Sequence, residues 1–63
     1  MNDAITYYTE IAERLTYRQL QQLCKQGRSM GYINKGFSLK QKRSILVAMA
    51  AAIYLRLEQA SQY

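Results

Sequence analysis

The sequence predicts a small all-α domain of three helices, folded as a single unit over residues 1–63. Three observations favour this fold class. Apolar residues recur at the i, i+3, i+4, i+7 spacing of a helix face, two capping-box patterns precede apolar segments, and the three Gly cluster at 27, 31 and 36 in a chain without Pro. We expect helices at about 3–14, 17–29 and 39–59, with a Gly-containing connector at 31–37.

The first two helices are each expected to bury one face. In the first, Asn2 or Asp3 is suited to cap the N-terminus, because a short polar side chain accepts a hydrogen bond from the free N–H groups there. The second begins with Thr16 as N-cap and Gln19 three residues later, which is a capping box. On a helical wheel its apolar side holds Tyr17, Leu20, Leu23, Cys24 and Gly27, and its opposite side holds Arg18, Gln21, Gln22, Lys25 and Ser29.

The third helix is expected to follow a connector in which Asn34 and Gly36 can take left-handed backbone angles. Ser38 with Gln41 is a second capping-box pattern, so we place the start of this helix at Leu39. Its apolar surface is wider than one neighbouring helix covers, so either two helices or a second subunit must pack on it. The surplus apolar face, a candidate partner or dimer interface, consists of Ile45, Ala48, Ala52 and Leu55.

Composition argues against an enzyme and against a metal or cofactor site. A single Cys cannot form an intrachain disulfide, and without His there is no Cys/His zinc set and no Ser-His or Cys-His pair for nucleophilic catalysis. We therefore expect no catalysis, metal, cofactor or small-molecule substrate, and we place Cys24 in the core. The longest apolar run, residues 45–55, is shorter than the roughly 20 residues of a membrane span, and the Met-Asn-Asp N-terminus shows no signal peptide, so a cytoplasmic protein is expected.

Charge is distributed unevenly along the chain. All nine Lys and Arg residues lie within residues 14–57, which contain no Asp or Glu, while the four acids stand at positions 3, 10, 13 and 58. The net charge of +5 is thus concentrated, as in proteins that bind phosphates or another polyanion. Nucleic acid, duplex DNA in the first instance, is the partner that this pattern predicts.

The sharpest local signal is a group of three cations, Lys40, Lys42 and Arg43, in the first turn and a half of the predicted third helix. Each is unfavourable there by ~0.3 to 1 kcal/mol, because free N–H groups form the positive end of the helix dipole, but together they make an anion site. The cations on both sides of the connector are Lys25, Arg28, Lys35, Lys40, Lys42 and Arg43. The alternative is that these side chains are simply solvated on helix surfaces.

Aromatic residues in the connector and polar residues near the start of the third helix are two further features typical of nucleic-acid binding. Tyr32 and Phe37 bracket Lys35, an alternation of aromatic and basic residues that stacks single-stranded bases; the alternative is that both rings anchor the connector to a small core. Contacts with base edges are expected from Gln41, Ser44 or Arg43.

The segment Leu-Thr-Tyr-Arg-Gln-Leu-Gln-Gln-Leu-Cys-Lys at 15–25 and the segment Ser-Leu-Lys-Gln-Lys-Arg-Ser-Ile-Leu at 38–46 resemble SAP-like domains and the Rho N-terminal helix-extended-helix domain over about residues 15–50. The residues that match the motif are Leu20, Leu23, Lys25, Gly36, Lys40 or Lys42, and Ile45 with Leu46. The connector is longer than the SAP turn, and the third helix continues further. The resemblance implies DNA binding through Arg28, Lys35, Lys40, Lys42 and Arg43.

The function that follows is a small non-enzymatic DNA-binding protein that contacts the phosphate backbone through the connector and the N-terminus of the third helix. The main alternative is a protein-interaction adaptor or homodimer, in which the surplus apolar face binds a partner and the basic edge steers an acidic one. Binding of the third helix to an anionic membrane surface is a further alternative.

Overall fold

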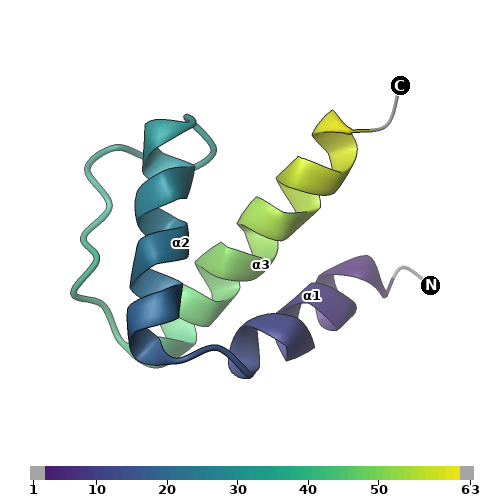
Figure 1. The fold of residues 1–63 in the computed structure, drawn as a ribbon, viewed down its shortest axis with the longest axis horizontal. Coiled ribbons are helices and arrows are strands. Elements are labelled where there is room, and N and C mark those ends of the chain that lie inside the picture. Colours follow the sequence, from purple (N-terminus) through teal and green to yellow (C-terminus); the bar gives the residue numbers. More distant parts are fainter. Residues whose placement is uncertain (1–2, 62–63) are drawn as a thin grey trace.

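The computed structural model describes residues 3–61, which form three helices: α1 (Ala4–Glu13), α2 (Tyr17–Ser29) and α3 (Arg43–Ala60). The predicted all-α class is confirmed, and the bounds of the first two helices agree with the prediction to within one residue. α3 packs against both α1 and α2, and the connector returns along the outer side of α2 to the start of α3 (Figure 1). Within the described range, no helix is long and apolar enough to cross a membrane.

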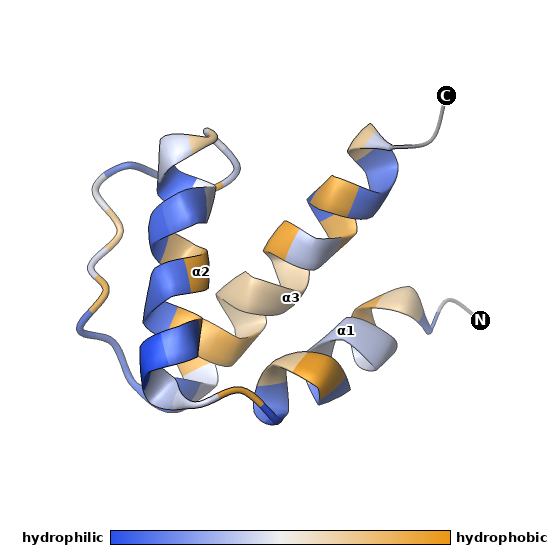
Figure 2. Cartoon of the chain, viewed as in Figure 1, coloured by the Kyte–Doolittle hydropathy of each residue, from blue (hydrophilic) through white to orange (hydrophobic). Residues whose placement is uncertain are grey.

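The core lies where α2 and α1 meet α3. Figure 2 shows that the edge of α2 facing α3 is apolar and its opposite edge hydrophilic, as the helical wheel predicts. The buried core residues are Ala12 from α1, Leu20 and Cys24 from α2, and Leu46, Val47, Ala50, Ala51 and Ile53 from α3. Burial raises the pKa of the Cys24 thiol, which the positive charge of Arg28 opposes only in part. Cys24 is therefore a protonated core side chain, as predicted, and not an activated nucleophile.

Local hydrogen bonds fix the start of α2. The Gln19 N–H donates to Thr16 Oγ1 at 3.1 Å, and the Thr16 N–H donates to Gln19 Oε1 at 2.9 Å. The predicted capping box is thereby confirmed, with both of its reciprocal bonds formed. At α1 the outcome differs, because Asp3 occupies the N-cap position without a capping bond from its side chain, and Asn2 lies outside the described residues.

A left-handed glycine ends α2. The N–H groups of residues 31 and 32 donate to the carbonyls of Arg28 and Gly27, respectively, which is the bond pattern of a Schellman motif. This motif requires a left-handed residue, and Gly31 supplies it with φ of +80°. The expectation that Asn34 or Gly36 would take the left-handed conformation is wrong, since neither has a positive φ. Asn34 instead closes a local turn by accepting a bond from the Gly36 N–H at 2.8 Å.

The connector is held against α2 by three side chains that donate to alternate main-chain carbonyls. The bonds run from Tyr17 Oη to the Gln41 oxygen at 2.6 Å, from Gln21 Nε2 to the Leu39 oxygen at 2.9 Å, and from Arg28 Nη1 to the Phe37 oxygen at 2.9 Å. The three donors share one face of α2, so they hold the carbonyls of residues 37, 39 and 41 along that face. We call these three bonds the connector ladder.

The connector ladder delays the start of α3. The prediction that this helix begins at Leu39 is wrong, because it begins at Arg43. In a helix starting at Leu39, the carbonyls of Leu39 and Gln41 would accept from N–H groups four residues later, but the ladder turns both toward α2. Ser38 Oγ accepts from the Lys40 N–H at 3.1 Å, so it closes a local turn instead of forming the predicted capping box.

A separate contact joins α1 to the far end of α3. The Tyr8 hydroxyl donates to the Glu58 carboxylate, and the Tyr8 ring stacks on Tyr54 with centroids 5.8 Å apart. The hydrogen bond to Glu58, reinforced by burial and by the charge of that carboxylate, raises the pKa of Tyr8. The hydroxyl therefore remains a donor at neutral pH, and the two helices stay joined.

The close approach of α2 and α3 depends on Gly27. A Cβ at this position would lie 2.4 Å from Cδ1 and 2.9 Å from Cγ1 of Ile53, a side chain that is only 1 % exposed. Both distances are shorter than carbon atoms tolerate without contact, and a buried isoleucine has little room to move aside. The absence of a Cβ at Gly27 thus allows the Ile53 side chain of α3 to pack directly against α2.

We predict that Gly27→Ala lowers the free energy of unfolding by about 1 to 2 kcal/mol, because overpacking against Ile53 outweighs the better helix propensity of Ala. Ile53→Val removes Cδ1, so the double variant should be less destabilised than the sum of the two single changes. Urea unfolding followed by circular dichroism measures all four proteins. Strictly additive free energies would contradict the proposed contact.

Candidate nucleic-acid interface

Two adjoining hollows lie between α2 and the connector. The first, of about 460 Å³, is lined by Arg18, Gln21, Gln22, Lys25, Leu39 and Lys40. The second, of about 370 Å³, is lined by Lys25, Arg28, Ser29 and Lys35. Because Lys25 lines both, the hollows adjoin along the connector side of α2, and we call them together the basic groove.

The basic groove is lined by cations and by no carboxylate. Its five cations are Arg18, Lys25, Arg28, Lys35 and Lys40. Residues 14–57 contain no Asp or Glu, so the sequence places no acid on the surrounding segments either. Like charges around a concave surface reinforce one another's potential, which raises the local concentration of anions. The groove therefore presents positive charge that no lining carboxylate offsets.

The connector ladder gathers these cations. Gln21 and Arg28 bind the connector carbonyls, so Lys35 and Lys40 run alongside α2 and face Lys25 across the groove. Arg28 donates one N–H to this scaffold and is half-buried, but a guanidinium has five N–H donors, so others remain for an anion. The three lysines of the groove are exposed. Arg28 thus shapes the groove and contributes charge to it.

The predicted cluster at the start of the third helix is wrong, because only one of its three cations is helical. Arg43 is the first residue of α3, Lys42 is its exposed N-cap, and Lys40 belongs to the connector and the basic groove. Of the six cations that were predicted to contact nucleic acid, the structure brings four together: Lys25, Arg28, Lys35 and Lys40.

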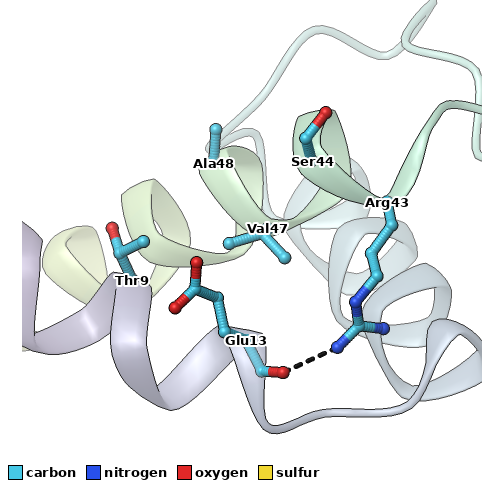
Figure 3. Close-up of a pocket in the computed structure, with 6 residues that line it drawn as sticks. All are labelled: Thr9, Glu13, Arg43, Ser44, Val47 and Ala48. Carbon is cyan, nitrogen blue, oxygen red and sulfur yellow. Dashed lines mark hydrogen bonds between the residues drawn. The ribbon is translucent and has the colours of Figure 1, made fainter.

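Arg43 lies apart from these four. Its Nη2 donates to the Glu13 carbonyl at 2.6 Å (Figure 3) and to the Leu15 carbonyl at 2.7 Å. The end of a helix leaves carbonyls without an intrahelical partner, and a cation there also complements the negative end of the helix dipole. Arg43 therefore joins the C-terminus of α1 to the N-terminus of α3, which is a structural role.

Two other predicted contacts, Tyr32 and Gln41, are half-buried. Tyr32 is half-buried against the core, and the Arg56 guanidinium lies 5.9 Å from its ring centroid, a cation–π distance. Gln41 is half-buried, and its main-chain carbonyl is part of the connector ladder. The anchoring explanation for the Tyr32 ring thus fits the structure better than a stacking platform does.

The surplus apolar face of α3 is covered more fully than predicted. Ile45 is 38 % exposed and Ala48 is exposed, but Ala52 and Leu55 are half-buried. Ala48 borders a hollow of about 390 Å³ between α1 and α3, whose lining residues are Thr9, Glu13, Arg43, Ser44, Val47 and Ala48 (Figure 3). Within the chain, two helices cradle α3, which is one of the two arrangements that its wide apolar surface predicted.

The predicted contacts omitted four polar residues of the groove: Arg18, Gln21, Gln22 and Ser29. A signal for them existed, because the helical wheel places all four on the polar side of α2 together with Lys25. What the wheel lacks is the position of the connector, which decides that this side of α2 is the wall of a groove and not an open helix surface.

Comparison with protein-family models, with curated proteins and with solved structures found no match. The resemblance to SAP-like domains therefore stays a prediction. Within residues 3–61, no group of three or more His, Cys, Asp or Glu side chains is placed to hold a metal ion. The chemistry of the basic groove is accordingly the main guide to function.

We predict that Arg43→Ala lowers the free energy of unfolding by about 1 to 2 kcal/mol, because it removes two charge-assisted hydrogen bonds at the end of α1. Lys42→Ala is the matched control, since it removes the same charge one residue away, at an exposed position, and should change stability by less than about 0.5 kcal/mol. Urea unfolding measures both variants. Equal losses would show that net charge, and not the helix junction, is the cause.

Proposed function

We propose that the protein is a small non-enzymatic DNA-binding protein whose basic groove contacts the phosphate backbone. The single observation that carries this proposal is the gathering of five cations and no carboxylate in one groove between α2 and the connector. Lys42, exposed at the N-cap of α3, is a further cation near the end of the connector. Compared with the expectation from the sequence, the centre of the contact moves from the start of α3 to the connector side of α2.

The chemistry of the groove suits a phosphate chain better than a single anion. Its cations are spread over two adjoining hollows, so they offer several weak sites in a row and no enclosed pocket. Lys and Arg contacts of this kind release condensed counterions from the nucleic acid, which supplies most of the affinity for a sequence-independent backbone. They orient the protein on the duplex without reading its sequence.

We predict that log K for a generic DNA duplex falls linearly with log salt, with a slope of about −4 for four to five neutralised phosphates. Lys40→Ala should make the slope shallower by about 0.9, because one phosphate contact is lost. Arg14→Ala is the charge-matched control, since Arg14 is exposed and lies outside the lining of the basic groove. Fluorescence anisotropy at several salt concentrations measures all three proteins.

A wild-type slope near zero would rule out phosphate binding. Equal effects of Lys40→Ala and Arg14→Ala on the affinity and the salt slope would mean that binding depends on net charge alone and not on the basic groove.

A second candidate is a homodimer or protein-interaction adaptor, with the basic groove steering an acidic partner. It is favoured by one observation, the exposure of Ile45 and of Ala48, of which Ala48 lines the hollow between α1 and α3. The patch is small, since Ala52 and Leu55 are half-buried.

This candidate predicts that the protein sediments as a concentration-dependent dimer and that Ala48→Glu makes it monomeric, because a charge would be buried at the contact. Ala48 is the residue of choice because it is exposed, so the change should leave the fold and the salt dependence of DNA binding intact. Sedimentation velocity of both proteins is the measurement. A wild type that stays monomeric at its highest soluble concentration contradicts self-association.

A further inference from the structure

The polar side chains of α2 divide into two sets with different tasks. One set is used by the fold: Gln19 completes the capping box, and Gln21 and Arg28 hold the connector. The other set consists of Arg18, Gln22, Lys25, Gln26 and Ser29, all exposed, and we call it the outer row. Within residues 3–61, no side chain of the outer row makes a hydrogen bond. Its donors and acceptors are therefore open to a ligand.

The outer row forms one continuous stripe. Its members follow i, i+4, i+7, i+8 and i+11 spacing, which places them on one face of a helix over three turns. Gln22, Lys25, Gln26 and Ser29 line a shared surface depression, which confirms that they are neighbours in space. The stripe is thus long enough to meet several successive units of a polymer.

The outer row stands between two hollows. The basic groove lies on its connector side. On the side of α3, a hollow of about 220 Å³ is lined by Leu15, Gln19, Gln22, Leu23, Gln26 and Tyr54. Gln22 lines hollows on both sides, so the outer row occupies the exposed face of α2 between the connector and α3. The DNA major groove is about 12 Å wide and admits one α-helix, so an exposed helix face of this kind can dock in it.

The outer row shares Arg18, Gln22, Lys25 and Ser29 with the lining of the basic groove, but its amides differ in chemistry from the cations. A Gln amide carries both a donor and an acceptor, so it can make the paired hydrogen bonds that distinguish adenine in the major groove. Arg makes the corresponding pair with guanine. Neutral amides add little to phosphate binding, which depends on charge. The outer row, with two amides at i and i+4, is therefore equipped for base edges more than for phosphates.

We infer that α2 is a recognition helix that inserts its outer row into the major groove of duplex DNA and selects sequence through Gln22, Gln26 and Arg18. This inference rests on the proposed function, and it adds a reading surface to the backbone contacts. Lys35 and Lys40 line the hollows on the connector side of the outer row, where they would meet the phosphates that border the DNA major groove. Duplex is favoured over single strand, because the connector rings Tyr32 and Phe37 are half-buried against the core instead of being presented for base stacking.

The test compares amide and charge variants of the full chain. Wild type, Gln22→Ala, Gln26→Ala and Lys40→Ala are each used to select from a random duplex pool, and preferred and scrambled duplexes are then titrated at several salt concentrations. Both glutamines are exposed and without hydrogen bonds, so their Ala variants keep the fold, which circular dichroism verifies.

We expect the wild type to prefer some duplex sequences over scrambled ones. Each Gln variant should lose about 5-fold to 100-fold of that preference at one position while keeping the wild-type salt slope. Lys40→Ala should weaken binding to all sequences alike and make the salt slope shallower by about 0.9. This opposite pattern separates reading of bases from binding of phosphates.

Two results overturn the inference and leave the proposed function standing: salt-dependent duplex binding without any sequence preference, or a preference that both Gln variants retain. Tighter binding to single strands than to duplex also overturns it, because a recognition helix needs a major groove. Absence of salt-dependent binding to any duplex overturns the inference and the proposed function together.

Discussion

Three side chains of α2 hold the connector by its main-chain carbonyls, and much of the structure depends on this connector ladder. Tyr17, Gln21 and Arg28 each donate to one of three alternate carbonyls, so the segment that follows α2 is held along that helix. The carbonyls of Leu39 and Gln41 accept these bonds, so they are not available for the helical hydrogen bonds of an α3 that started at Leu39. α3 therefore begins at Arg43. In a domain of this size, with a core of few large side chains, such directional bonds fix a segment that apolar packing alone would hold loosely.

The three faces of α2 have three different environments. Its inner face, with Leu20 and Cys24, belongs to the core; a second face supplies the connector ladder; and the outer row remains exposed. Gly27 contributes to this arrangement, because it allows α3 to approach the inner face of α2 closely. The other two faces of α2 are not covered by α3. The electrostatics follow from the same arrangement, since the connector returns Lys35 and Lys40 to the side of α2 that already carries Lys25.

The two ends of α3 show which features of the fold could be predicted from the sequence and which could not. Helical periodicity predicted its body and its C-terminal region well, because apolar spacing over many residues is a strong signal. Its start was misplaced, because Ser38 with Gln41 has the spacing of a capping box and no local property of the sequence reveals that the Gln41 carbonyl is bonded by a tyrosine 24 residues earlier. Arg43 shows the same limit, since its guanidinium is bound at the end of α1, far along the chain.

By itself, the sequence determined the all-α class, the bounds of α1 and α2, the capping box at Thr16 and the segregation of positive charge, all of which depend on local spacing or on composition. Only the tertiary structure decided which cations meet. It joined Arg18 to Lys40 and removed Arg43 from the group, because hydrogen bonds between distant segments, and not the order of residues, set the path of the connector. Charge can be counted along a chain, but a binding surface exists only once the chain is folded back on itself.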